Sequence, residues 1–230
     1  MIFGQLLTGS NYDDEEERVT AGRNGLGIKL VSIFSKKFEV EGCDPAKKLI
    51  LNQVWTNNMK TTSDPKIKSS RLKGYTKVSW IPDFIRFGLT EYTHDIVKLY
   101  TRYVIDAAMI SKIQVYLNDE LIPVKSLSQY AELYSDSSPE KLLIKYKSCE
   151  VLVTPASNYQ AISFVNGVYT RLGGQHVDSW AETIFRPIVD KFNGKDKKQK
   201  IKSPKITIVD VKQFFRVFVV ATVIRPEFNG

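Results

Sequence analysis

Hydrophobic and polar positions follow one another in segments that predict interspersed helices and strands. Residues 28–34 carry apolar side chains at helical spacing and predict a helix with one face packed inward. Residues 93–108 and 177–192 show the same period over longer stretches. Pro187 stands inside the second stretch and is expected to kink that helix or end it. A shorter helix is expected over residues 127–134.

Strand signals fill most of the chain between these helices. Alternating or β-rich segments predict strands at 38–41, 48–56, 76–82, 113–117, 121–124, 142–146, 150–155 and 160–165. Residues 205–223 carry a mixed signal, and the apolar stretch from Phe214 to Ile224 contains Arg216, so it predicts a buried strand and not a membrane span. Because strands and helices alternate, the fold class is α+β or α/β in two layers, with a boundary near 111–127.

Composition is that of a globular protein. The chain has 230 residues, 43% apolar and 25% charged, with a net charge of +8. Two cysteines far apart and two histidines argue against a disulfide scaffold and against a metal site of the zinc-ribbon or His-rich kind. No signal peptide and no apolar run of membrane-spanning length is visible, so an intracellular location without a membrane partner is expected.

The charge is distributed unevenly. Residues 13–17 form an acidic run, whereas residues 190–205 hold seven lysines against two aspartates, a local net charge of +5. Such a single-sign cluster suits a polyanion such as DNA. A solvated loop that contacts nothing would have the same composition, and both interpretations stay open at this point.

A glycine-rich stretch directly precedes the first predicted helix. Residues 22–27 read GRNGLG, and we call residues 22–29 the glycine loop. Glycines let backbone N–H groups approach phosphate oxygens, and the positive end of the following helix adds to that attraction. Lys29 lies in the first turn and is expected to reach a terminal phosphate. The pattern is neither a Walker A sequence nor a clean dinucleotide fingerprint, and a turn that merely caps a helix is the alternative.

Several motifs, taken together, resemble one family. Residues 1–34, MIFGQLLTGSNYDDEEERVTAGRNGLGIKLVSIF, are similar to the ATP-lid region of eukaryotic-type type IIA DNA topoisomerases. That family reads LLTSSNYDD, an acidic stretch, and then GRNGYGAK. The similarity continues through QVWTNNM (53–59), through residues 95–124 and through ISFVNGVYTRLGGQHVD (162–178), so it covers nearly the whole chain. Within that family, the amino-acid sequence most resembles the enzymes of large cytoplasmic DNA viruses.

The resemblance implies a layout and partners. It implies an α+β fold, with the back part of a GHKL-type ATPase domain over residues 1–115, including the ATP lid, followed by the first part of an α/β transducer domain over 116–230. It also implies ATP and Mg²⁺ as cofactors and double-stranded DNA as partner. The full-length enzyme would be a homodimer that relaxes and decatenates DNA by passing one duplex through a transient double-strand break.

Site residues follow from the same resemblance. Gly9 replaces a family serine, Leu26 a tyrosine and Ile28 an alanine, but the backbone amides remain, so phosphate contacts are expected to survive. The implied ATP-binding residues are Gly9, Ser10, Asn11, Gly22, Arg23, Asn24, Gly25, Leu26, Gly27, Ile28 and Lys29. The lysine-rich segment matches a DNA-proximal basic loop of the transducer, whose implied DNA-binding residues are Lys195, Lys197, Lys198 and Lys200.

No catalytic or metal-binding residue is expected within these 230 residues. The family's metal-ligand asparagine and catalytic glutamate precede the lid, and its γ-phosphate lysine and DNA-cleaving tyrosine lie further on. The chain alone is therefore expected to be inactive or nearly so. His176 is expected to be structural. Another GHKL ATPase and a non-enzymatic basic DNA-binding module remain as alternatives. The expected location is the host cytoplasm, at viral replication sites, for a viral enzyme and the nucleus for a cellular one.

Overall fold

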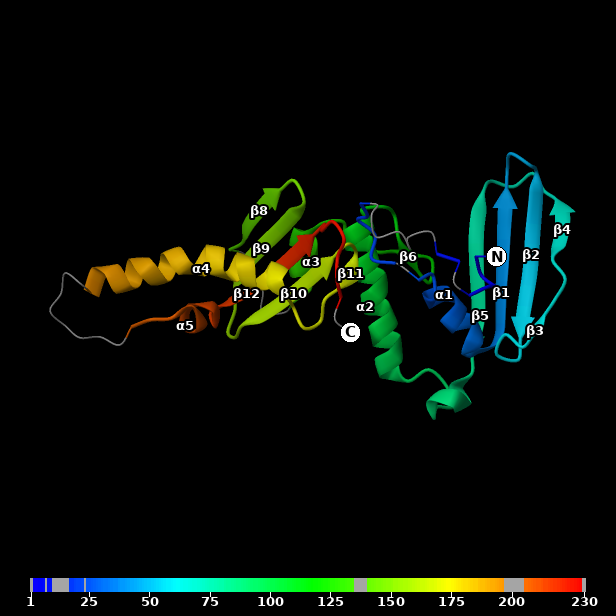
Figure 1. The fold of residues 1–230 in the computed structure, drawn as a ribbon, viewed down its shortest axis with the longest axis horizontal. Coiled ribbons are helices and arrows are strands. Elements are labelled where there is room, and N and C mark those ends of the chain that lie inside the picture. Colours follow the sequence, from blue (N-terminus) through cyan, green and yellow to red (C-terminus); the bar gives the residue numbers. More distant parts are fainter. Residues whose placement is uncertain are drawn as a thin grey trace. The chain divides into compact units, whose positions relative to one another are not determined.

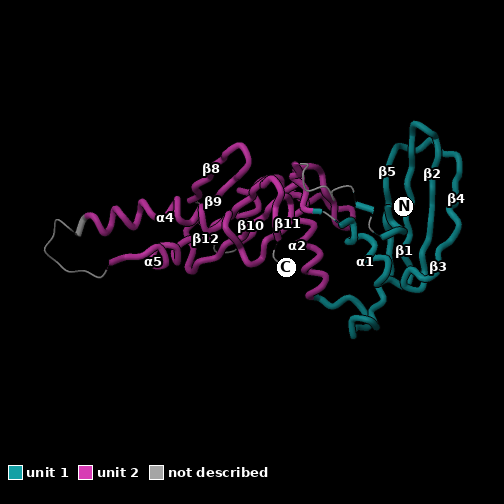
Figure 2. Tube along the Cα trace, in the orientation of Figure 1, with its two compact units in different colours: residues 1–16, 22–94 teal, residues 17–21, 95–230 magenta. Residues whose placement is uncertain are grey.

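The protein forms two compact units (Figure 2). The computed structural model describes residues 2–6, 8–9, 17–22, 24–134, 140–196 and 205–228, without the side chains of 195–196. Unit 1 holds residues 1–16 and 22–94, and unit 2 holds residues 17–21 and 95–230. The predicted boundary at 115 falls inside unit 2. The assignment of ATPase and transducer parts from the family resemblance stays a prediction.

Unit 1 is built on an antiparallel sheet with one helix at its start. The strands run in the order β3-β2-β1-β5, and β4 also pairs with β2 (Figure 1). The elements are α1 (Gly27–Ile33), β1 (Ser35–Asp44), β2 (Leu49–Thr56), β3 (Thr61–Thr62), β4 (Lys66–Ser69), β5 (Tyr75–Pro82) and the 3-10 turn η1 (Phe84–Phe87).

The core of unit 1 lies on one face of this sheet. Phe38 of β1 and Trp55 of β2 stand opposite each other in the register, with ring centroids 5.8 Å apart. Both are buried, and Ile28 and Val31 of α1 pack against the same cluster. Apolar side chains three positions apart on a helix share one face, so this packing fixes α1 against the sheet. The glycine loop at the start of α1 is thereby held on a rigid support.

Unit 2 is a mixed sheet with helices on both faces. Its strands run in the order β11-β10-β12-β9-β8, and β10 and β12 are parallel, whereas the other pairs are antiparallel. The elements are α2 (His94–Ser111), β6 (Tyr116–Leu117), β7 (Glu120–Leu121), α3 (Leu127–Ala131), β8 (Leu142–Tyr146), β9 (Cys149–Pro155), β10 (Gln160–Val165), β11 (Val168–Tyr169), α4 (Gln175–Asp196), α5 (Ile208–Lys212) and β12 (Phe215–Ala221).

The central strand β12 contributes to two cores. Phe218 packs on one face with Met109 of α2 and Tyr130 of α3. Val217 and Val219 face the other way and pack with Phe185 of α4. A strand buried on both faces reads as a continuous apolar run, which explains the predicted strand around residues 214–224.

Arg216 is accommodated within that buried strand. Only 5% of this residue is exposed. Its Nε donates to Gln160 Oε1 over 3.0 Å, and the guanidinium lies 4.8 Å from the centre of the Tyr134 ring. Buried charged groups are tolerated when they are paired in this way.

Most predicted elements are found with shifted ends. The strands at 142–146 and 160–165 are observed as predicted, and the helix predicted at 28–34 is α1. Of the two outcomes expected at Pro187, a kink or an end of the helix, the end is wrong, because α4 continues to Asp196. The mixed signal at 205–223 resolves into α5 and β12. Among the residues described, no helix has the length and hydrophobicity to cross a membrane.

Candidate functional site

The start of α1 offers backbone amides without partners inside the helix. Leu26 is the N-cap residue, has helical dihedral angles and makes no side-chain capping hydrogen bond. The first helical bond runs from Leu30 N to Leu26 O over 3.0 Å. The amides of residues 27–29 precede that bond, so they have no acceptor within the helix. Together with the helix dipole, such amides suit an anion.

Lys29 stabilises the glycine loop with a buried side chain. It is only 2% exposed, although it carries a charge. Its Nζ donates to the Gly25 carbonyl oxygen over 2.6 Å and to Thr8 Oγ1 over 2.7 Å. An ammonium group has three N–H donors, and these two bonds tie the glycine loop to the segment around residue 8.

Gly25 is required by its conformation and by close packing. Its φ is +60°, a left-handed conformation that favours glycine. A Cβ built on Gly25 would lie 3.1 Å from Gly9 N and 3.4 Å from Lys29 Nζ. Gly9, Gly25 and Lys29 therefore meet at one point, although Gly9 is distant from the other two in sequence.

The structure brings some predicted ATP-binding residues together and leaves others untested. Gly22 and Gly27 border open space, because a Cβ on either would meet nothing within 4 Å. Ile28 turns its side chain into the core, so only its backbone faces the loop. Asn24 and Leu26 lie in the described loop, whereas Ser10, Asn11 and Arg23 lie outside the described residues.

Two features at this site were not predicted from the sequence. Thr8 was missed as a loop residue, and the only signal for it is a hydroxyl side chain next to Gly9. Lys29 was expected to reach a terminal phosphate. In the structure its ammonium is bonded to Thr8 and Gly25, so its observed contacts hold the loop in shape.

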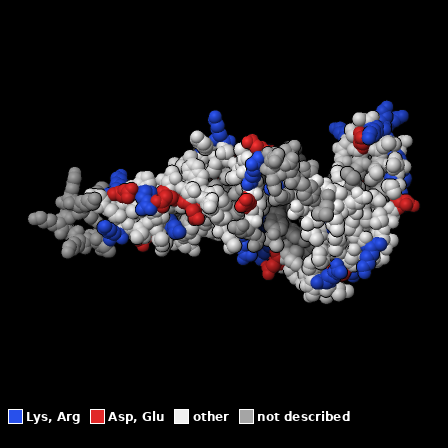
Figure 3. Space-filling view, in the orientation of Figure 1, with Lys and Arg blue, Asp and Glu red and all other residues white. Residues whose placement is uncertain are grey.

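The predicted DNA-binding lysines fall at the edge of the described chain. Lys195 lies in the last turn of α4 without a described side chain, and Lys197, Lys198 and Lys200 lie outside the described residues. The residues on either side of this segment are hydrogen-bonded to each other, because Asn193 Nδ2 donates to Ile206 O over 2.9 Å and Ile206 N donates to Asn193 Oδ1 over 3.0 Å. Over α4 itself, basic and acidic side chains are interspersed (Figure 3).

His176, in the first turn of α4, is half-buried and bonded to a neighbouring side chain. His176 Nε2 lies 3.1 Å from Thr170 Oγ1, and burial lowers the pKa of the imidazole, with Asp178 opposing that effect. Within the described part of the chain, no three His, Cys, Asp or Glu side chains gather in a way that could hold a metal ion.

Comparison with known proteins identifies the family. The family model described as DNA gyrase B matches residues 88–230. The chain belongs to the DNA gyrase B family. Over its whole length it is 40% identical to DNA topoisomerase 2 of Invertebrate iridescent virus 6, covering 21% of that protein, and 37% identical to DNA topoisomerase 2 of Bombyx mori, covering 15%. The chain thus spans about a fifth or less of the curated relatives it matches.

Solved structures show the same fold. All of the chain aligns with 59% of the ATPase region of Saccharomyces cerevisiae topoisomerase II, with 36% identity and a TM-score of 0.86. It also aligns with 59% of the ATPase and transducer domains of DNA topoisomerase II from Balamuthia mandrillaris, with 31% identity and a TM-score of 0.87. The predicted α+β fold and the resemblance to eukaryotic-type topoisomerase II are therefore confirmed.

Proposed function

We propose that this chain is part of an ATP-dependent type IIA DNA topoisomerase and contributes its ATP lid and phosphate-binding loop. The convergence of Gly9, Gly25 and Lys29 at the start of α1 carries the proposal. The similarity to the ATPase region of yeast topoisomerase II supports it. We assign residues 1–115 to the ATPase domain and residues 116–230 to the transducer domain.

The proposed chemistry at the loop is phosphate binding. Amides of residues 27–29 would donate to phosphate oxygens, and the glycines would let those oxygens approach the backbone. Leu26 and Ile28 would contribute only their backbone, and Lys29 would keep the loop in shape while adding positive charge nearby. ATP is the nucleotide that this arrangement would hold, together with the predicted residues Ser10, Asn11 and Arg23.

Hydrolysis needs groups that we place elsewhere in the longer protein. Phosphoryl transfer requires a positioned water or base and neutralisation of phosphate charge by cations, commonly Mg²⁺. The described residues include no cluster suited to a metal ion. On the family resemblance, we propose that the Mg²⁺ ligand and the catalytic carboxylate lie outside these 230 residues, and that the chain alone is inactive or nearly so.

DNA and a second subunit complete the proposal. Double-stranded DNA would contact the lysine-rich segment that begins at the end of α4, through Lys195, Lys197, Lys198 and Lys200. Phosphate contacts from lysines fix position without reading sequence, so no sequence preference is expected from them. The full-length protein would act as a homodimer that relaxes and decatenates DNA.

We also propose a viral origin, with African swine fever virus as the specific candidate. The amino-acid sequence of residues 1–34 and the 40% identity to an iridescent virus protein support an origin in a large cytoplasmic DNA virus. The expected location is then the viral replication site in the host cytoplasm. Imaging of the protein in infected cells tests this, and accumulation in the nucleus would favour a cellular origin.

ATP hydrolysis by the longer protein tests the proposed function. Lys29→Met removes two charge-assisted hydrogen bonds of about 1.5–3 kcal/mol each, so we expect turnover to fall by at least about 100-fold. Lys36→Met removes an exposed lysine from neighbouring β1 and should leave turnover unchanged. Equal turnover in both variants would contradict the proposed site. DNA binding without any ATP turnover in the unaltered protein would favour a basic binding module.

A further inference from the structure

The five residues before the glycine loop belong to a different unit from the loop itself. Glu17–Ala21 group with unit 2, whereas the chain on both sides of them groups with unit 1. We call residues 17–21 the tether. A single peptide bond joins its last residue, Ala21, to Gly22 of the glycine loop.

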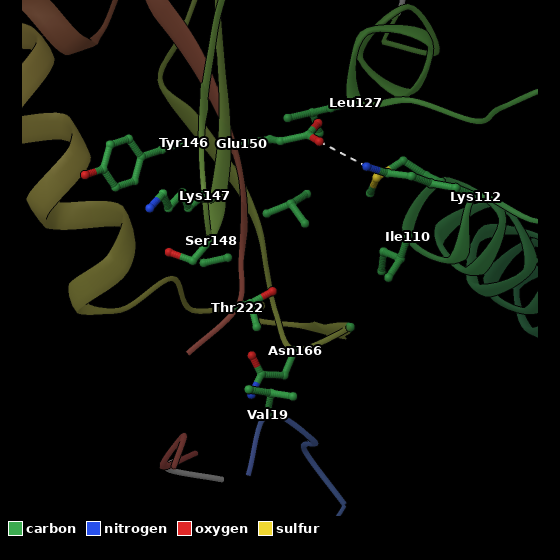
Figure 4. A pocket seen from close by; sticks show the side chains of 15 residues that line it. Val19, Ile110, Lys112, Leu127, Tyr146, Lys147, Ser148, Glu150, Asn166 and Thr222 are labelled. Carbon is green, nitrogen blue, oxygen red and sulfur yellow. Dashed lines mark hydrogen bonds and ion pairs between the residues drawn. The ribbon is translucent and has the colours of Figure 1, made fainter. Parts of the chain in front are cut away.

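The tether is held by the segment that follows β12. The Arg225 N–H donates to the Arg18 carbonyl oxygen over 2.9 Å. Val19 lines a cavity of about 470 Å³ in unit 2, together with Asn166 and Thr222 (Figure 4). The hydrogen bond and the position of Val19 place the tether alongside the end of the central strand.

Asn166 holds that segment in turn. Asn166 and Gly167 form the two-residue turn between β10 and β11, with φ of 49° and 81°. This is the Asn-Gly turn favoured in tight hairpins, and it leaves the carboxamide free to bond elsewhere. Asn166 Nδ2 donates to Val223 O over 2.8 Å, and Val223 N donates to Asn166 Oδ1 over 2.7 Å. A carboxamide is one of the few side chains able to do both.

These contacts form one connected path. It leads from the β10–β11 turn through Val223 and Arg225 to Arg18, and the chain itself continues from Arg18 to the glycine loop. Trans peptide bonds keep successive Cα atoms 3.8 Å apart, so a shift of the tether by several ångströms must be taken up within the few residues that follow.

We propose that Asn166 is a positioning residue that holds the tether and thereby couples the glycine loop to the central sheet of unit 2. The proposal rests on the proposed nucleotide site and adds to it a route by which nucleotide and sheet affect each other. In thermodynamic terms such a coupling is reciprocal, because what the sheet does to nucleotide affinity the nucleotide does to the sheet.

Unit 2 contains a matched control for this test. Asn193 makes the same pair of hydrogen bonds with Ile206, at the end of α4 and away from the tether. Asn166→Ala and Asn193→Ala therefore remove the same chemistry at two places. Asn166→Asp keeps the acceptor for Val223 N but faces the Val223 carbonyl with a carboxylate, so it gives a second variant should Asn166→Ala fail to fold.

Hydrogen exchange on this chain tests the path directly, without nucleotide. We expect the Arg225 amide to exchange at least about fivefold faster in both Asn166 variants, since each loses about 1–3 kcal/mol of bonding. The Val223 amide should exchange faster in Asn166→Ala, which removes its acceptor. In Asn193→Ala these two amides should exchange as in the unaltered chain, and the Ile206 amide should exchange faster instead. An unchanged Arg225 amide in the Asn166 variants would overturn the proposal.

Nucleotide binding by the longer protein tests the consequence. We expect Asn166→Ala to weaken binding of a non-hydrolysable ATP analogue several-fold, whereas Asn193→Ala leaves the Kd unchanged. Absence of binding by the unaltered protein would reject the proposed function, and hydrogen exchange would still decide the tether. Binding by the unaltered protein, with faster exchange but an unchanged Kd in Asn166→Ala, would reject the coupling alone.

Discussion

At the scale of single residues, the glycine loop depends on one left-handed backbone conformation and one buried ammonium group. Gly25 supplies the first and Lys29 the second. Neither works through an exposed functional group, because both act by fixing backbone positions. The loop is therefore more sensitive to changes in shape than to changes in surface chemistry.

Alanine substitutions at Gly25 and Gly27 test whether the left-handed conformation of Gly25, and not glycine content as such, stabilises the loop. Gly25→Ala forces a side chain into a left-handed conformation and against Gly9 N, so we expect a loss of about 1–2 kcal/mol in the free energy of unfolding. Gly27→Ala, at the first residue of α1 and facing open space, should be neutral or stabilise by up to about 1 kcal/mol. Urea unfolding measures both. Equal effects would contradict the loop geometry.

At the residue level, the sequence offered candidates where the signal was local. Gly25 and Lys29 were candidates because glycines before a helix with a following lysine are a known phosphate-binding pattern, whereas Gly9 was a candidate only through the family resemblance. It did not reveal the bond from Lys29 to Thr8, because the two residues are 21 positions apart and only the fold brings them together. It also gave no sign that Asn166 reaches Val223, which is 57 positions away.

At the scale of elements, the hydrophobic periodicity predicted the helices and strands that have a buried face. Strand β10 ends in four consecutive buried residues, and its sequence gave a clear strand signal. Strand β4 has four exposed positions and was missed, because a strand with neither face buried carries no alternation. Pro187 does not end its helix, because the long apolar face of α4 packs against the core on both sides of that residue.

Acid sensitivity is expected at the start of α4. Burial lowers the pKa of His176, so the folded protein binds this proton more weakly than the unfolded chain, whose imidazole has a pKa near 6.5. Unfolding then takes up a proton, and stability falls as the pH drops below about 6.5. His176→Gln keeps a polar partner for Thr170 without titrating. Urea unfolding at pH 7.5 and 5.5 should show a smaller acid loss in the variant, and parallel losses would contradict this.

At the scale of the whole molecule, the chain combines two units that divide between residues 94 and 95. The family resemblance implied a boundary between the ATPase and transducer parts at residue 115, and that assignment stays a prediction. Helix α2 packs Met109 against the core of unit 2. A sequence pattern shows that a helix has an apolar face, but not which core covers that face.

DNA binding by the lysine-rich segment should make the affinity of the whole molecule depend on salt. If four lysines contact B-DNA phosphates, the slope of log K against log salt is about −3.6. Changing the four predicted lysines to alanine should remove that contribution from the slope: Lys195, Lys197, Lys198 and Lys200. A control set of four exposed lysines from unit 1 should leave it largely unchanged: Lys47, Lys48, Lys66 and Lys68. Affinity titrations across salt concentrations measure the slope. An equal reduction of the slope by both sets of substitutions would contradict a specific role of the lysine-rich segment in DNA binding.

The central claim is that the chain holds the phosphate loop of a nucleotide site whose other groups lie elsewhere. A thermal-shift titration with Mg²⁺ and a non-hydrolysable ATP analogue tests it most directly, on this chain and on a version extended at both ends. At about a hundredfold excess over Kd, binding adds about 2.7 kcal/mol, or roughly 5–11 °C in Tm. The account predicts that shift only in the extended version. A comparable shift in this chain alone, or none in either, would contradict it.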